Sequence, residues 1–450
     1  MISKGILSNA ILYAFVMFEV LLYNSQGLLQ FVLSIFCYLT LFILSNINLK
    51  VSVLYYISFS LLSFGEWSYV ITDMPNNFYG IRIGGISLNV IFLFYLVIRI
   101  MTDRSNKLNK DFVFKHSIFF FVFLYCFVLG LLNVSLGVNF VDNFLANVMV
   151  YLPLLFQLIL VSILGYEDLQ ILLKKVIGVS IFGMILSFIL NVRFEYSEGY
   201  DYLLISGVSF ILPFSIYLFR GYFNKNVYYL LVLIIIYFLF SGNIFINGKL
   251  FVILGVLTIW LFKIEMKKIK RIIMIPLLII FISPFLIQKI KNDPIMSYKF
   301  NQISAVFNGE GNIKSSDGSL ANIFGEFYCI YEHMKNNPDY LVFGKGFGGG
   351  VPDQNNLLGQ YAGESGYKEI DRIRNDFTTM HISLSELLLK FGLFGVFIFL
   401  TLLLKLFLSR SREDFILFIL LFTVFYTSKE MCLLTVVFIA IRYHKNLIHA

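Results

Sequence analysis

Apolar runs of about twenty residues recur along most of the chain, and this repetition constrains the fold more than any other feature. In lipid, backbone N–H and C=O groups must be paired internally, so a bilayer core of roughly 30 Å is crossed by apolar helices of about this length. Of the 450 residues, 58% are hydrophobic and only 14% are charged, whereas soluble domains carry roughly a quarter charged residues. The sequence therefore predicts an all-α polytopic membrane protein.

We expect about fourteen transmembrane helices and one large extracytoplasmic loop. Eleven apolar runs precede a long polar stretch and three follow it. The chain is thus divided into residues 1–287 with helices 1 to 11, an outer loop over residues 288–382, and residues 383–450 with helices 12 to 14. The predicted spans lie near residues 5–23, 28–46, 51–65, 85–101, 117–135, 146–164, 176–192, 203–219, 228–241, 248–263, 271–288, 383–405, 414–427 and 430–443.

Lys and Arg occur in short clusters between the apolar runs, and loops rich in these residues stay on the cytoplasmic side of a membrane. The clusters fall in alternate loops, one of which contains Lys174 and Lys175, so we assign these loops and both termini to the cytoplasm. The segments over residues 66–84, 193–202 and 288–380 then face outward. The net charge of +8 forms no continuous basic stripe, and nucleic acid is not an expected partner.

The outer loop contains one stretch with the periodicity of a helix. From Ser319 to Asn336 the apolar residues recur at helical spacing, and Asn337 and Pro338 follow as a stop signal. We expect an amphipathic helix here, lying over the membrane. The glycine-rich residues 343–350 come next and predict a backbone that can approach a ligand closely. A flexible surface turn is the alternative interpretation of these glycines.

Where the outer loop enters the twelfth predicted span, a histidine stands at the mouth of the helix. His381 is followed after eleven residues by Gly392 and three residues later by Gly395. We expect it to be the only one of the five histidines outside the membrane. Its side chain titrates near neutral pH, so it can accept a proton or form a hydrogen bond with a sugar or a phosphate. A histidine that caps the helix at the interface is the alternative.

The spacing of His381, Gly392 and Gly395 resembles the signature of bacterial O-antigen ligases and Wzy-type O-antigen polymerases. Gly344 and Gly346 are similar to the Gly-x-Gly turn that follows an amphipathic helix in the long outer loop of that family. In that signature the residue after the histidine is often polar, and here it is Ile382. The resemblance covers detailed motifs only between residues 319 and 395.

This resemblance implies a metal-independent enzyme with the multi-span (GT-C-like) glycosyltransferase architecture, without cofactors, in the bacterial cytoplasmic (inner) membrane. Such an enzyme would polymerise undecaprenyl-diphosphate-linked oligosaccharide repeat units into surface polysaccharide, either O-antigen or capsule, at the outer face of that membrane. The expected partners are the lipid-linked glycan donor and acceptor, the lipid bilayer, a chain-length regulator and a flippase.

The resemblance also implies roles for individual residues. His381 would polarise or deprotonate the acceptor hydroxyl, and cations would hold the diphosphate, for which the planar fork of arginine is well suited. Lys249 stands near the place where family members often carry an arginine. Four cations expected to bind the diphosphate or to form a basic funnel toward it lie in the predicted outward segments: Arg372, Arg374, Arg193 and Arg82. The fifth, Lys249, follows the tight turn over residues 242–248 between the ninth and tenth predicted spans.

Alternatives remain open at this point. Arg372 and Arg374 could simply pair at the surface with their acidic neighbours Glu369, Asp371 and Asp376. At the level of function, the alternatives are an O-antigen ligase that transfers glycan to the lipid A core, and a flippase or transporter of lipid-linked oligosaccharide. Transporters usually show two related halves and ionisable residues near the bilayer midplane. Both features are scarce in this chain, which argues against the transporter. Between the two enzymes we favour the polymerase, because the motif match is degenerate and the polymerases of this family vary more than its ligases.

Overall fold

The computed structural model describes residues 8–22, 28–63, 78, 81–83, 86–103, 108–197, 200–203, 319–354, 358, 369–378, 383–408, 417 and 429–449. The chain divides into two compact units. Unit 1 comprises Met1–Val128, Leu145–Leu257 and Leu400–Ala450, and unit 2 comprises Leu129–Phe144 and Thr258–Phe399. Each unit is considered by itself below.

The described elements are mainly helices, with two short antiparallel hairpins, β1–β2 and β3–β4. Strand β1 and the hairpin β3–β4 lie in or next to segments predicted to face outward, whereas β2 lies at the start of the predicted fourth span. In chain order they are α1 (Asn9–Leu22), α2 (Leu28–Ile47), α3 (Leu49–Leu62), β1 (Arg82–Ile83), β2 (Ile86–Ser87), α4 (Leu88–Thr102), α5 (Lys110–Lys115), α6 (Ser117–Ser135), α7 (Val141–Val161), α8 (Tyr166–Ile189), β3 (Arg193–Ser197), β4 (Tyr200–Leu203), α14 (Ser319–Asn336), α15 (Pro338–Phe343), α16 (Glu369–Arg374), α17 (Ser383–Leu408) and α19 (Lys429–His449).

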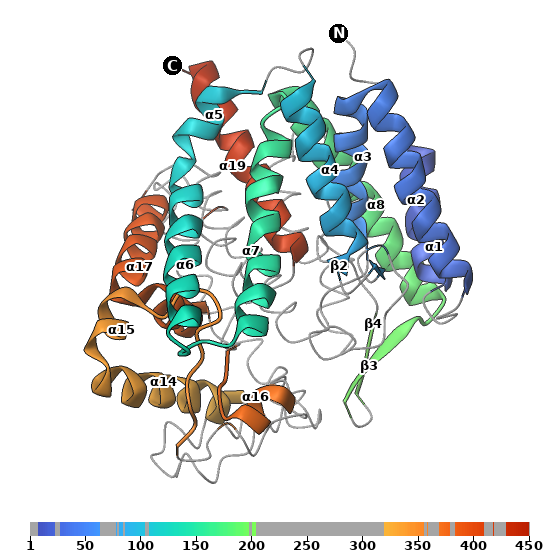
Figure 1. The fold of residues 1–450 in the computed structure, drawn as a ribbon. Coiled ribbons are helices and arrows are strands. Elements are labelled where there is room, and N and C mark those ends of the chain that lie inside the picture. The colour runs from blue at the N-terminus through green and yellow to red at the C-terminus, as the bar shows by residue number, and fades with distance from the viewer. Residues whose placement is uncertain are drawn as a thin grey trace, which may run out of the picture. The chain divides into compact units, whose positions relative to one another are not determined.

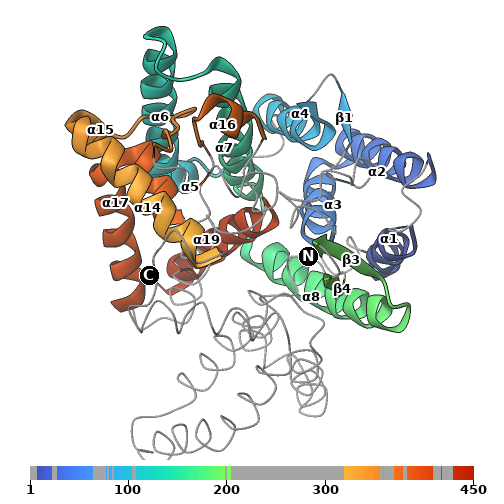
Figure 2. The ribbon, with the colours of Figure 1, turned by 90° about the horizontal axis from the view of Figure 1, so that it is seen from below.

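In unit 1, α1, α2, α3, α4 and α8 run side by side (Figures 1 and 2), and α8 packs against α1, α3 and α19. α2 illustrates why these sequences form membrane helices. Its buried face carries polar residues at helical spacing, including Gln30, Ser34 and Ser45, whereas outward residues such as Phe36 and Leu39 are apolar and exposed. An apolar outer face is the arrangement expected of a helix that contacts lipid.

Among the described residues, five helices are long and apolar enough to cross a membrane. They cover Leu28–Ile47, Ser117–Ser135, Val141–Val161, Tyr166–Ile189 and Ser385–Leu406, and shorter apolar helices cover Asn9–Leu22, Leu49–Leu62, Leu88–Thr102 and Thr435–His444. Helices therefore occupy the predicted spans 1 to 7, 12 and 14, and several passes through a membrane are plausible. The predicted spans near residues 203–219, 228–241, 248–263, 271–288 and 414–427 lie almost entirely outside the described residues.

One boundary and one loop were predicted wrongly. α8 begins at Tyr166, ten residues before the predicted span, so Lys174 and Lys175 lie inside a helix and not in a loop. The early start has a local cause, because Asp168 in the first turn accepts a hydrogen bond of 2.8 Å from the backbone N–H of Gly165. Lysines inside an apolar helix can extend their long stems to place the ammonium near water.

Unit 2 contains the helices of the outer loop. α14 has the predicted bounds, Ser319–Asn336, and α15 begins with Pro338 at the stop signal. Helices α14, α15 and α16 lie together at one end of this unit (Figures 1 and 2). Beneath α14, a small apolar core joins segments that are distant in sequence: Cys329, Ile330, Met334, Val351, Leu358, Phe377 and Leu389. The outer loop therefore has a packed interior of its own.

Candidate functional site

The residues that follow α15 form a buried turn, which we call the glycine segment (residues 344–350). All seven of its residues are buried, so the interpretation of these glycines as a flexible surface turn was wrong. Two asparagines hold it in place, Asn133 in the last turn of α6 and Asn139 in the connection between α6 and α7. Asn133 Nδ2 donates to the carbonyl of Lys345 over 2.8 Å, and Asn139 Nδ2 donates to the carbonyls of Lys345 and Phe347, each over 3.1 Å.

The glycine segment also fills a break in α17. At Gly392 the backbone has φ 62° and ψ −166°, which interrupts the helix. The carbonyls of Leu389 and Lys390 accept hydrogen bonds from the backbone N–H groups of Lys345 (2.8 Å) and Gly346 (3.0 Å). Gly344 has φ 77°, and a Cβ atom on it would lie 2.6 Å from the nitrogen of Gly392. Two of the predicted motif glycines, Gly344 and Gly392, thus meet backbone to backbone, where a side chain could not fit.

The other two motif glycines have simpler surroundings. Gly346 has φ 69°, in the left-handed region that favours glycine. Gly395 lies in α17 with its Cα against the side chain of Phe391. Neither observation identifies a contact with a substrate, so the functional roles of the four glycines remain predictions.

Two lysines are buried beside the glycine segment. Lys345 is 4% exposed, donates to the carbonyl of Gly350 over 2.6 Å, and lies over the ring of Tyr340. Lys390 is fully buried and donates to the carbonyl of Thr378 over 3.1 Å and, more weakly, to that of Gly349 over 3.5 Å. Burial lowers the pKa of Lys345, and the charge of Lys390 lowers it further, against the opposing effect of Asp376. The core of the site is therefore cationic.

Asp376 provides a carboxylate next to these cations. It lies in the link between α16 and α17, and its side chain packs directly against the Cα of Gly350, where no Cβ could be added. Burial raises the pKa of this carboxyl above its usual value, while the charges of Lys345, Lys390 and Arg374 partly offset that increase.

Arg374 is the one predicted cation whose side chain the structure describes. Its Nη1 lies 2.7 Å from Oδ2 of Asp142, in the first turn of α7, and its guanidinium stacks over the ring of Phe140 at 4.5 Å. Burial by itself would raise the pKa of Asp142, but the hydrogen bond and charge of Arg374 outweigh this and lower it. The arginine is thus paired with Asp142 at a partly exposed position.

The other predicted site residues are not brought together in the described part of the chain. Arg372 lies in α16, Arg82 in β1 and Arg193 in β3, and only their backbones are described. His381 and Lys249 lie outside the described residues. Their predicted roles therefore stay predictions.

Sequence reasoning missed the residues that build this site. Lys390 carries a charge inside a predicted span, which was a usable signal, since ionisable residues in apolar helices are costly and often functional.

His333 was missed through an error. His333 lies in α14, which is not among the helices that could cross a membrane. The prediction that His381 is the only histidine outside the membrane therefore overlooked His333. His333 stacks on Tyr340, and burial followed by the charge of Lys345 lowers its pKa to about 4.

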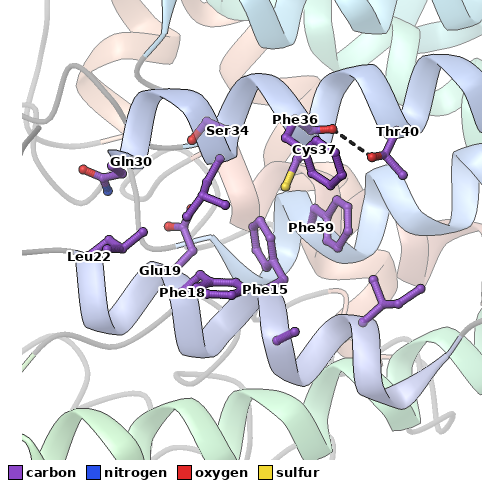
Figure 3. Close-up of a pocket in the computed structure, with 13 residues that line it drawn as sticks. Phe15, Phe18, Glu19, Leu22, Gln30, Ser34, Phe36, Cys37, Thr40 and Phe59 are labelled. Carbon is purple, nitrogen blue, oxygen red and sulfur yellow. Dashed lines mark hydrogen bonds between the residues drawn. The ribbon is translucent and has the colours of Figure 1, made fainter. Parts of the chain in front are cut away.

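Unit 1 contains a separate cavity of about 230 Å³ between α1 and α2, closed at one side by Phe59 of α3 (Figure 3). Its walls are mainly apolar, with Phe15 and Phe18 among them, but Glu19 and Gln30 also line it. Ser63 donates a hydrogen bond of 3.3 Å to Oε2 of Glu19. The acid is thus held by a neighbouring hydroxyl, and none of the predicted site residues lines this cavity.

Within the described ranges, no group of three or more His, Cys, Asp or Glu side chains is arranged to hold a metal ion. Comparisons of the chain with protein-family models, with curated proteins and with solved structures found no match. Inferences about its activity therefore rest on its own residues and on the resemblance of its motifs.

Proposed function

We propose that this chain is a membrane-embedded polysaccharide polymerase, which joins undecaprenyl-diphosphate-linked repeat units at the outer face of a bacterial cytoplasmic membrane. In this proposal both termini are cytoplasmic, and unit 2 contains the reaction site. The lipid diphosphate is the leaving group and supplies the driving force for transfer, so the enzyme needs no nucleotide.

The observation that carries the proposal is the buried glycine segment docked into the break of α17. It joins the Gly-x-Gly turn and the glycine after His381, the two parts of the chain that carry the resemblance, although 48 positions separate Gly344 from Gly392. Lys345 and Lys390 lie within this junction. Rigid elements that hold cations in a water-poor site suit the binding of a diphosphate whose charge grows as it leaves.

The position of Thr378 adds support. Its carbonyl accepts a hydrogen bond from Lys390, and Thr378 lies three residues before His381. The ammonium therefore fixes the chain close to the residue expected to contact the acceptor hydroxyl. The partly exposed Arg374 provides a cation at the edge of the same unit, and a phosphate could compete with Asp142 for its guanidinium.

The test is a gel of surface polysaccharide from cells that lack this chain, with and without restoration of the wild-type protein. We expect the deletion to leave a single repeat unit on the lipid core, and restoration to return the full ladder. His381→Ala and Arg374→Ala should both lose long glycan although the proteins insert normally. Long glycan that accumulates on its lipid carrier would instead indicate a ligase, and an unchanged ladder would contradict both enzymes and favour a transporter.

A further inference from the structure

The cavity between α1 and α2 in unit 1 is long and narrow. α1 packs mainly against α8 and α2 mainly against α3, and the cavity lies between the two helices (Figure 3). The residues that line it extend from Ile11 to Leu22 along α1 and from Gln30 to Thr40 along α2. At a rise of about 1.5 Å per helical residue, the cavity is about 15 Å long.

The volume of the cavity limits its ligand to a slender one. A dry apolar cavity of about 150 Å³ holds one benzene molecule, and this cavity measures about 230 Å³. It is therefore too small for an oligosaccharide repeat unit but large enough for part of one hydrocarbon chain. Its mainly apolar walls, which include Phe15, Phe18 and Phe59, also favour a hydrocarbon.

The cavity is open at the outer surface of α1 and α2. Three apolar residues that line it, Ile11, Phe18 and Phe36, are 48%, 42% and 64% exposed. The outward residues Leu21 and Leu39 of the same helices are also exposed and apolar, as expected of helices that contact lipid. A lipid chain can therefore enter the cavity from the side, without leaving a hydrocarbon environment.

One end of the cavity is polar. Glu19 in the last turn of α1, Gln30 in the first turn of α2 and Ser34 one turn later all line it, and each is more than nine-tenths buried. Figure 3 shows them toward the end of the cavity marked by Leu22, with Thr40 toward the opposite end. Because helices that cross a membrane end near the lipid head groups, this end is where a head group would lie.

The charge at the polar end favours a cation. Among the described residues that line the cavity none is Lys, Arg or His, and Glu19 is acidic. Ser63, at the end of α3, donates a hydrogen bond of 3.3 Å to the carboxyl of Glu19, but a hydroxyl brings no charge. A carboxylate buried among apolar residues is stabilised by a cation within reach. A head group that has no cation, such as a lipid diphosphate, is disfavoured by the same carboxylate.

The hydrogen-bonding groups narrow this cation to a primary ammonium. The carboxylate of Glu19, the side-chain carbonyl of Gln30 and the hydroxyl of Ser34 can all accept a hydrogen bond. An –NH₃⁺ group has three donors, which matches these three acceptors, whereas a quaternary ammonium has no N–H to donate.

We propose that this cavity binds one membrane lipid whose head group carries a primary ammonium, as in phosphatidylethanolamine. Part of one hydrocarbon chain lies between α1 and α2, and the ammonium lies at Glu19, Gln30 and Ser34. This inference goes beyond the proposed function and does not depend on it, since none of the residues assigned to the reaction lines the cavity.

Native mass spectrometry of the full-length protein tests the choice of head group. The protein, purified in detergent, is mixed with equal amounts of phosphatidylethanolamine, phosphatidylcholine and phosphatidylglycerol that have identical acyl chains. We expect the wild type to retain one phosphatidylethanolamine at least about tenfold more often than either other lipid, as a charge-assisted hydrogen bond would provide. Glu19→Gln keeps the shape but removes the charge, and should reduce this preference to within about twofold. Glu167→Gln, at an exposed position of α8, is the matched control and should keep the preference.

Filling the cavity tests the place of the hydrocarbon chain. Ala14 lines the cavity, so Ala14→Phe should reduce the bound phosphatidylethanolamine by about tenfold or more. Ala10→Phe makes the same change at an exposed position of α1 and should leave binding unchanged. Size-exclusion profiles in detergent confirm that each variant is folded. If Ala14→Phe does not fold, the nearly isosteric Glu19→Gln decides the proposal by itself.

Equal retention of the three lipids by the wild type would overturn the proposal, and so would a preference for phosphatidylethanolamine that Glu19→Gln leaves intact. Retention by folded Ala14→Phe equal to that by Ala10→Phe would show that the chain does not lie in this cavity. None of these measurements uses glycan transfer, so a failure of the proposed function and a failure of the lipid site are distinguishable.

Discussion

Replacing Gly392 by alanine tests the junction between the glycine segment and α17. The residue has φ 62°, and a Cβ atom there would lie 2.6 Å from the nitrogen of Gly344 and 2.6 Å from the carbonyl carbon of Val342. Both neighbours are backbone atoms, which cannot rotate away as a side chain can. We therefore expect the junction to open in Gly392→Ala while the apolar part of α17 still inserts.

The magnitude follows from two contributions. A left-handed φ costs alanine about 1–2 kcal/mol. The two hydrogen bonds from Lys345 and Gly346 to the carbonyls of α17 would be strained or lost, at about 0.5–1.5 kcal/mol each. Unit 2 should therefore be destabilised by about 2–5 kcal/mol, which corresponds to an increase in the opening equilibrium of about thirty-fold or more.

Cys329 reports this opening, because it is 4% exposed in the core beneath α14 and burial raises the pKa of its thiol, so it reacts slowly in the folded state. A variant that keeps Cys329 as its only cysteine is labelled with a maleimide, and the rate is compared with that of Gly392→Ala. Gly137→Ala is the matched control, since Gly137 has φ 72° with nothing within 4 Å of an added Cβ. Labelling of Gly392→Ala less than about fivefold faster than Gly137→Ala would refute the close-contact argument.

Two further predictions concern titration and surface charge. The pKa of His333 is about 4 in the folded protein and 6.5 in the unfolded chain, so the folding stability should fall as the pH decreases from 6.5 towards 4. The expected loss is about 1–2 kcal/mol after allowance for solvent access. Thermal melting of His333→Gln that shows the same loss of stability over this pH range would contradict the prediction. Asp142→Asn removes an exposed partner of Arg374 and should lower the folding stability by less than about 1 kcal/mol, and 1 M salt should abolish this difference. A loss of thermal stability that does not depend on salt would contradict the description of this pair as a screened surface ion pair.

Local patterns in the sequence were sufficient to predict α14. Its bounds follow from apolar residues at helical spacing and from the stop at Asn337 and Pro338, and both signals depend only on neighbouring residues. The same reasoning placed the helices of the predicted spans near residues 28–46 and 117–135, where apolar runs are long and uninterrupted. It failed at the start of α8, where a side-chain cap at Asp168 extended the helix beyond its most apolar part.

The candidate site could not be predicted in the same way, because its contacts join distant segments. Nothing near Gly344 in the sequence indicates that Gly392 will approach its backbone, and the hydrogen bonds from Asn133 and Asn139 to the glycine segment cross more than two hundred positions. The burial of Asp376 likewise depends on Gly350, which a local reading treats as a loop residue. Motif spacing singled out these glycines but could not indicate that Gly344 and Gly392 meet.

Lys390→Met tests whether a buried ammonium holds the end of the outer loop to α17. Methionine fills nearly the same volume, but the carbonyls of Thr378 and Gly349 lose their donor, and Glu386, whose Oε1 lies 3.9 Å from the ammonium, loses a partner charge. Removing one partner of a buried ion pair costs about 3–5 kcal/mol, so the Cys329 labelling rate should rise by about a hundredfold or more.

Adding Glu386→Gln separates the two causes of that loss. If the ion pair matters, the double variant Lys390→Met/Glu386→Gln should be labelled several-fold more slowly than Lys390→Met, because it no longer leaves a carboxylate without its cation. If only the carbonyl contacts matter, the second substitution should change nothing. Lys335→Met, at an exposed position of α14, controls for the loss of a positive charge. A labelling rate for Lys390→Met equal to that of Lys335→Met would refute the role of Lys390, since a fully buried ammonium cannot be removed without cost if its carbonyl partners hold the loop in place.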